Sequence, residues 1–165
     1  MALSAIIGDK RLSINSEIKE KCLDVMRERL KEAGFQVEAI DLVLLGISVA
    51  EKDKSIDLIR PDCDEVGKKS NDKTMIISLN RLNDEQLGAL IALALNKFGV
   101  ENLDDTLDKA VDLWQKLTEQ GLKKLYCKYF INFGSGEPDL EGFYAKIHEL
   151  LKKTIPAIQA NMQSI

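Results

Sequence analysis

The sequence predicts a mostly α-helical protein, a compact and irregular bundle of five or six helices with short β-strands near residues 5–14, 55–59 and 74–79. Three observations lead to this prediction. Apolar side chains recur at helical spacing over most of the chain, capping residues and glycines bracket the periodic stretches, and the branched, strand-like runs are short. The alternative is an α+β fold with a small sheet.

The N-terminal stretch contains two short apolar runs, residues 5–7 and 12–14, on either side of Gly8. These runs predict either a small hairpin or an irregular arm lying on the core. Asn15 or Ser16 then offers a helix cap, because a short side-chain oxygen accepts from the free amides of a first turn. A helix is predicted over residues 17–33, with its apolar positions on one face.

Gly34 is placed to end this helix, since glycine tolerates a positive φ. Residues 37–49 are apolar on all sides, which indicates either a buried helix or a central strand. Branched residues and Gly46 favour the strand. We expect the helix, because charges occur only at the ends of the stretch and at Asp41.

Residues 52–73 are polar and predict a long surface loop, a feature that is often functional or mobile in compact domains. Three further helices are predicted, and they start at Asn83 or Asp84, near Leu103, and at Asp139 or Leu140. Gly121 is expected to break or bend the second of these. Pro156 is expected to kink the third, because proline lacks an amide donor.

The composition fits one globular domain over residues 1–165, since 45% of the 165 residues are hydrophobic and no repeat or linker interrupts the chain. The net charge of −4 argues against nucleic acid as the main partner, because phosphate neutralisation needs a basic excess. It suits solubility and a basic protein partner. Lysines and aromatics alternate over residues 123–130, but the aromatics have helical spacing and are predicted to face the core.

The cysteines, Cys22, Cys63 and Cys127, are odd in number and widely spaced, which is typical of a reducing compartment. No stretch is long and apolar enough for a membrane span, and the N-terminus does not resemble a signal peptide. We therefore expect a soluble, cytoplasmic protein with no membrane partner.

No motif specifies a reaction, a metal or a cofactor. Asp53–Asp57 resembles the start of a calcium loop, but the required glycine and glutamate do not follow. Residues 67–70 resemble the end of a phosphate-binding loop without its first glycine. His148 is the only histidine, and no nucleophile has a suggestive spacing to it. An enzyme is therefore less expected than a binding protein.

One local resemblance lies in residues 74–98, especially Leu87-Gly88-Ala89-Leu90-Ile91-Ala92-Leu93. This stretch is similar to part of the phosphoglucose isomerase family. It covers a small part of a chain that is far shorter than members of that family. No activity or site residue is carried over from it.

The most distinctive feature is an acidic helix that carries Glu101, Asp104, Asp105, Asp108 and Asp112. The aspartates at 104, 108 and 112 share one face, and like charges at this spacing repel. Acids in the first turn complement the helix dipole, but the last two lie beyond it. The plain interpretation is a solvated face. The functional interpretation is a contact surface for a basic protein.

These observations predict a protein-interaction module, such as an adaptor, an inhibitor or an immunity-type protein, that binds a basic partner through the acidic helix. A first alternative is a subunit of a homo-oligomer, with the apolar stripe of the C-terminal helix as its association surface. A second alternative is a small enzyme or ligand-binding protein with a pocket near residues 52–73.

Overall fold

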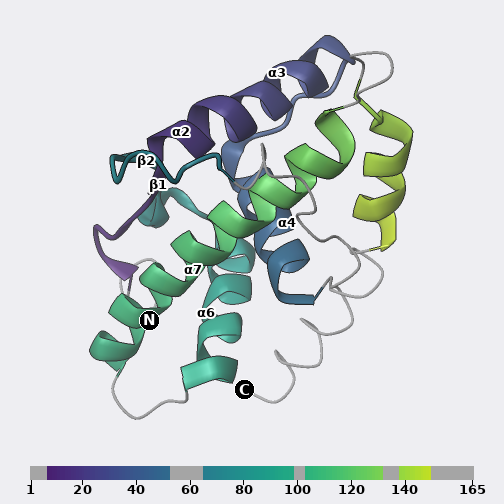
Figure 1. Ribbon diagram of the computed structural model, residues 1–165. Coiled ribbons are helices and arrows are strands. Elements are labelled where there is room, and N and C mark those ends of the chain that lie inside the picture. The colour runs from purple at the N-terminus through teal and green to yellow at the C-terminus, as the bar shows by residue number, and fades with distance from the viewer. Residues whose placement is uncertain (1–6, 53–64, 99–102, 132–137, 150–165) are drawn as a thin grey trace.

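The computed structural model describes residues 7–52, 65–98, 103–131 and 138–149. Over these residues the chain is mostly α-helical with a small two-stranded sheet, which confirms the predicted fold class. Within the same residues, no helix is long and apolar enough to cross a membrane. In Figure 1, the long helix α7 crosses the front of the molecule and α4 lies behind it.

The sheet joins two strands that are far apart in the sequence. β1 (Arg11–Asn15) runs antiparallel to β2 (Lys73–Ser78), with Leu12 opposite Ile77 and an irregular register directly after Leu12. Strands are therefore present at two of the predicted positions. The predicted strand at residues 55–59 lies outside the described residues.

Residues 12–14 lie in β1 and pair with β2, and of residues 5–7 only Ile7 is described, so the choice between the predicted hairpin and the irregular arm falls outside the described residues. An isolated two-stranded hairpin is at best marginally stable in water. Pairing with β2 leaves Leu12 and Ile14 fully buried and Ile77 only 8% exposed, so it gains apolar burial that a local hairpin does not offer.

The first predicted helix forms as one continuous rod with a wider turn inside it. Its parts are α2 (Ser16–Ile18), the π-helical turn η1 (Lys19–Leu23) and α3 (Asp24–Glu32). Asn15 caps it, because its side-chain oxygen accepts from the N–H groups of Glu17 and Ile18 at 2.9 and 3.3 Å. Gly34, with a φ of 93°, follows its end as predicted.

α4 (Ala39–Lys52) is a helix, which decides between the two structures predicted for this stretch. It places apolar side chains on opposite sides, with Ile40 and Val43 in one part of the core and Leu42 and Val49 in another. A helix enclosed from both sides needs apolar residues around its whole circumference. The continuous run of apolar residues, which had also been compatible with a strand, therefore reflects the burial of α4 on two sides.

A single 3₁₀ turn, η2 (Leu79–Arg81), leads from β2 to α6 (Asp84–Phe98). Asn83 begins α6 with a reciprocal pair of hydrogen bonds. The N–H of Gln86 donates to Asn83 Oδ1 at 2.9 Å, and the N–H of Asn83 donates to Gln86 Oε1 at 3.1 Å. This capping box satisfies two amides of the first turn and confirms Asn83 as the cap.

α7 (Leu103–Leu125) packs against α4, and this is the most extensive contact between any two described elements. The two helices cross at two glycines. A Cβ added to Gly121 would lie 1.7 Å from the carbonyl oxygen of Gly46, so the backbones are in direct contact. α7 continues through Gly121 to Leu125, so the predicted break there is wrong. Glycine is needed at this position for close approach.

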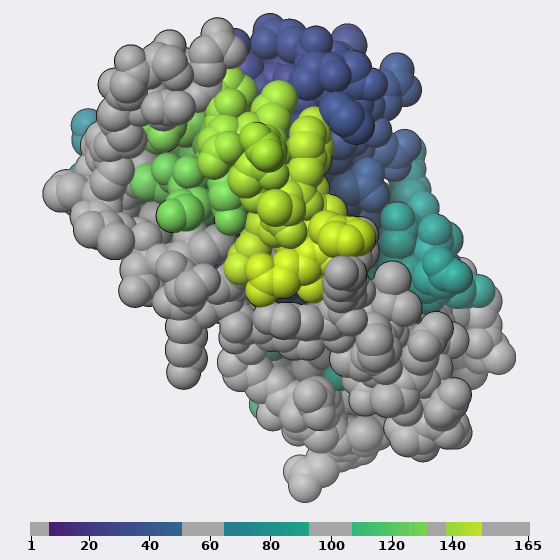
Figure 2. Space-filling model, turned by 90° about the vertical axis from the view of Figure 1, so that its right-hand side faces the viewer, coloured from purple at the N-terminus to yellow at the C-terminus, as the bar shows by residue number. Residues whose placement is uncertain are grey.

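α7 continues into the π-helical turn η3 (Tyr126–Phe130), and residues 140–149 form a further helix close to the predicted start. Asp139 caps this helix by accepting from the N–H of Gly142 at 3.0 Å. The Phe143 ring meets the Phe130 ring edge to face, with centroids 5.0 Å apart. Figure 2 shows this helix in yellow between the end of α7 in green and the N-terminal helices in blue. Pro156 lies outside the described residues.

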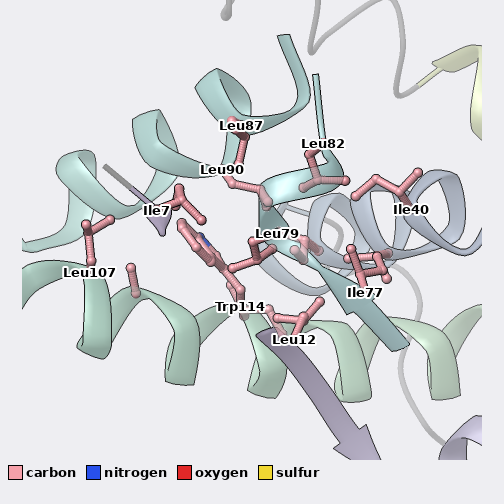
Figure 3. Close-up of a cluster of buried hydrophobic side chains, with 14 residues drawn as sticks. Ile7, Leu12, Ile40, Ile77, Leu79, Leu82, Leu87, Leu90, Leu107 and Trp114 are labelled. Atoms are coloured by element: carbon pink, nitrogen blue, oxygen red, sulfur yellow. The ribbon is translucent and has the colours of Figure 1, made fainter. Parts of the chain in front are cut away.

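Two hydrophobic clusters form the core, and α4 and α7 contribute to both. The first cluster, shown in Figure 3, consists of Ile7, Leu12, Ile40, Val43, Ile47, Ile77, Leu79, Leu82, Leu87, Leu90, Leu107, Ala110, Trp114 and Leu117. The second cluster consists of Ile14, Ile18, Cys22, Leu23, Met26, Leu30, Leu42, Val49, Leu122, Leu125, Tyr129, Phe130 and Phe143.

Candidate interaction surface on α7

α7 turns one side to the first cluster, and the part of its opposite side that carries Asp108 and Asp112 is exposed. Leu107, Ala110 and Trp114 are buried, whereas Asp108 and Asp112 are exposed. Residues three and four apart share a face of a helix, so the apolar set and the acidic set lie on different sides. The structure therefore confirms the amphipathic helix on which the predicted acidic surface depends.

The structure describes the side chains of two of the five predicted acidic residues. Glu101 lies outside the described residues, and Asp104 and Asp105 lie in the first turn of α7, where only the backbone is described. The Asp108 side chain is 72% exposed and forms an ion pair with Lys10. Asp112 is exposed one turn further along the helix.

The same side of α7 covers the outer edge of β1. The N–H of Ser13 donates to Gln115 Oε1 at 2.9 Å, and the N–H of Asn15 donates to Glu119 Oε1 at 2.7 Å. An edge strand with free N–H groups is a template for pairing with another chain. These two side chains close that edge from within the molecule.

Sequence reasoning missed the role of Gln115 and Glu119. They continue the helical row that begins at Asp108, seven and eleven residues further on, so the row itself was visible. The backbone amides that these two side chains bind could not be predicted from the sequence. Which edge of β1 is free becomes known only when β2 is identified as its partner. Part of the polar side of α7 is thus used for internal contacts.

Asn15 also holds the described end of the 52–73 loop. Its Nδ2 donates to the carbonyl oxygens of Gly67 and Ser70 at 3.0 and 2.7 Å. With the two bonds that its oxygen accepts, the side chain is fully occupied although it is only 5% exposed. Residues 65–72 are therefore fastened to the start of α2.

Gly67 is the point of closest contact in this loop. It has a φ of 87°, and a Cβ there would lie 2.8 Å from the side chain of Ile18. Its N–H donates to Glu17 Oε2 at 3.1 Å. Hydrogen bonds from Lys21 and from this N–H lower the pKa of Glu17. Gly67 therefore packs against α2. This contact accounts for the glycine in residues 67–70, the segment that resembled the end of a phosphate-binding loop.

Among the nucleophile candidates, Cys22, Cys127 and His148 lie in the described part of the chain. Cys22 is buried, and this burial raises the pKa of its thiol to about 12, so little thiolate forms at neutral pH. Cys127 is disulfide-bonded, which differs from the reduced state that the cysteine pattern led us to expect. His148 is exposed, and Cys63 lies outside the described residues. Among the described residues, no group of histidines, cysteines and acids is arranged to hold a metal.

The aromatic residues near the end of α7 behave as predicted. Tyr129 and Phe130 belong to the second cluster, and Tyr126 is half-buried. Lys128 is exposed beside them. Two of the three rings are therefore part of the core, as their helical spacing predicted.

No family model, no curated protein and no solved structure matches this chain. The resemblance of residues 74–98 to phosphoglucose isomerases therefore gains no support. A proposal about function depends on the geometry of α7 and its surroundings.

Proposed function

We propose that this protein is a protein-interaction module, such as an adaptor, an inhibitor or an immunity-type protein, and that the acidic side of α7 binds a basic partner. The observation that supports it most directly is the exposure of Asp108 and Asp112 on the side of α7 away from the first cluster. Glu101, Asp104 and Asp105 belong to the same proposed surface by their place in the sequence.

The ion pair between Lys10 and Asp108 supports the proposed chemistry, because it places an ammonium group against this side of α7. Pairs between exposed groups contribute only about 0–1 kcal/mol to stability. A lysine or arginine of a partner would therefore replace Lys10 at little cost. It would also relieve the repulsion along the row, which costs a few tenths of a kcal/mol per pair.

Charge reversal tests the proposal. The basic protein captured from a lysate of the source organism is titrated against the wild type and against D108K/D112K. Complementary charges chiefly speed association and confer specificity, so we expect about a tenfold or greater loss of affinity at low salt and a smaller loss at moderate salt. Unchanged affinity of D108K/D112K at low salt would contradict the proposal.

A matched control separates the local surface from net charge. Glu20 and Glu28 are exposed on the first helical rod, and E20K/E28K changes the net charge by the same amount as D108K/D112K. This control variant should keep wild-type affinity. An equal loss in both double variants would show that overall charge, and not the side of α7, governs capture.

One observation bears on the homo-oligomer alternative. Phe35 is 48% exposed, and its ring lies 4.9 Å from that of Tyr144 on the helix at 140–149. Contiguous exposed apolar patches mark association surfaces, and Phe35 is the exposed member of this pair. Hydrodynamic mass distinguishes the two readings: a monomeric wild type would remove the self-association alternative, and a dimer would favour it.

The ligand-binding alternative near residues 52–73 and the cytoplasmic location both stay predictions. A ligand that binds only the native state must raise the melting temperature, so a screen of metabolites tests the first. The redox state of Cys127 tests the cytoplasmic location, because disulfides such as the one at Cys127 persist mainly in oxidising compartments. A reduced Cys127 in cells would agree with the cytoplasm.

A further inference from the structure

We draw no further inference here: the strongest candidate, the exposed apolar patch that Phe35 and Tyr144 form between the end of α3 and the helix at 140–149, has nothing in the described structure to show what covers it.

Discussion

The two hydrophobic clusters meet where α4 crosses α7, and they differ in the polar groups that they enclose or border. The first cluster encloses the Trp114 ring, whose Nε1 has no hydrogen-bond partner within the described part of the chain. The second is bordered by Asn15, next to Ile14 and Ile18, and the Asn15 side chain makes four hydrogen bonds. The first cluster thus has a buried donor without a described partner. The second is bordered by the fully bonded Asn15 side chain and also by the Tyr144 hydroxyl, which is buried without a partner among the described residues.

The two clusters also differ in the interactions that stabilise them. The first cluster is mostly aliphatic and depends on apolar area and shape, which tolerate substitution by residues of similar volume. The second combines ring contacts between Phe143, Tyr129 and Phe130 with directional hydrogen bonds nearby. The proposed acidic surface lies over the more tolerant of the two, so changes to its charge should leave the fold intact.

The largest effect is expected at the crossing that joins the clusters. In Gly121→Ala, the new Cβ would lie 1.7 Å from the Gly46 carbonyl oxygen, so the helices must separate and both clusters lose packing. We expect a loss of at least about 3 kcal/mol in the free energy of unfolding, measured by urea denaturation.

Gly46→Ala is the matched control at the same crossing. Its nearest contact would be the backbone N of Leu122 at 3.4 Å, and alanine favours a helix over glycine by about 1 kcal/mol. The free energy of unfolding of Gly46→Ala should therefore stay within about 1 kcal/mol of the wild type. Equal destabilisation by Gly121→Ala and Gly46→Ala would contradict the expectation that the helix crossing requires glycine at position 121 but not at position 46.

The next effect concerns the covalent bond beside the second cluster. Cys127→Ser should lower the free energy of unfolding by about 2–4 kcal/mol, and a reductant should then have no further effect. In the wild type, alkylation under denaturing but non-reducing conditions should modify Cys22 and spare Cys127. Alkylation of Cys127 under those conditions would show that the disulfide is absent.

Asn15 tests whether the polar contacts specify the second cluster. Asn15→Ala removes the cap of α2 and the two bonds to the loop, and we expect a loss of about 2 kcal/mol in the free energy of unfolding. Asn15→Ser keeps an acceptor for the cap, so its loss should be nearer to about 1 kcal/mol. Hydrogen exchange at residues 65–72 should rise in both variants. Unchanged exchange would argue against the fastening of the loop.

The smallest effect is expected in the first cluster. Trp114→Phe removes a donor that has no described partner but leaves a small cavity at a fully buried site, and because the two effects partly offset, the free energy of unfolding should fall by only about 1 kcal/mol. Phe143→Leu is the comparison in the second cluster. It should lose about 1–2 kcal/mol, because it also removes ring contacts. A larger loss at Trp114 than at Phe143 would reverse the comparison between the clusters.

Local features of the fold could be predicted because neighbours in the sequence decide them. Asn15 and Asn83 begin helices since their own side chains reach the amides of the next turn. Gly34 ends one because a residue without a Cβ adopts a positive φ without strain. The amphipathic side of α7 follows from helical spacing, so the exposure of Asp108 and Asp112 also followed from the sequence.

Only the tertiary structure decided the contacts between distant segments. The partner of β1, the contact of Gly46 with Gly121, and the binding of the β1 edge by Gln115 and Glu119 each join residues that no local pattern links. The physical reason is that local propensities describe one segment at a time. Burial and backbone hydrogen bonding are satisfied by the whole chain at once, so the same glycine that breaks an isolated helix allows a close crossing in the folded protein.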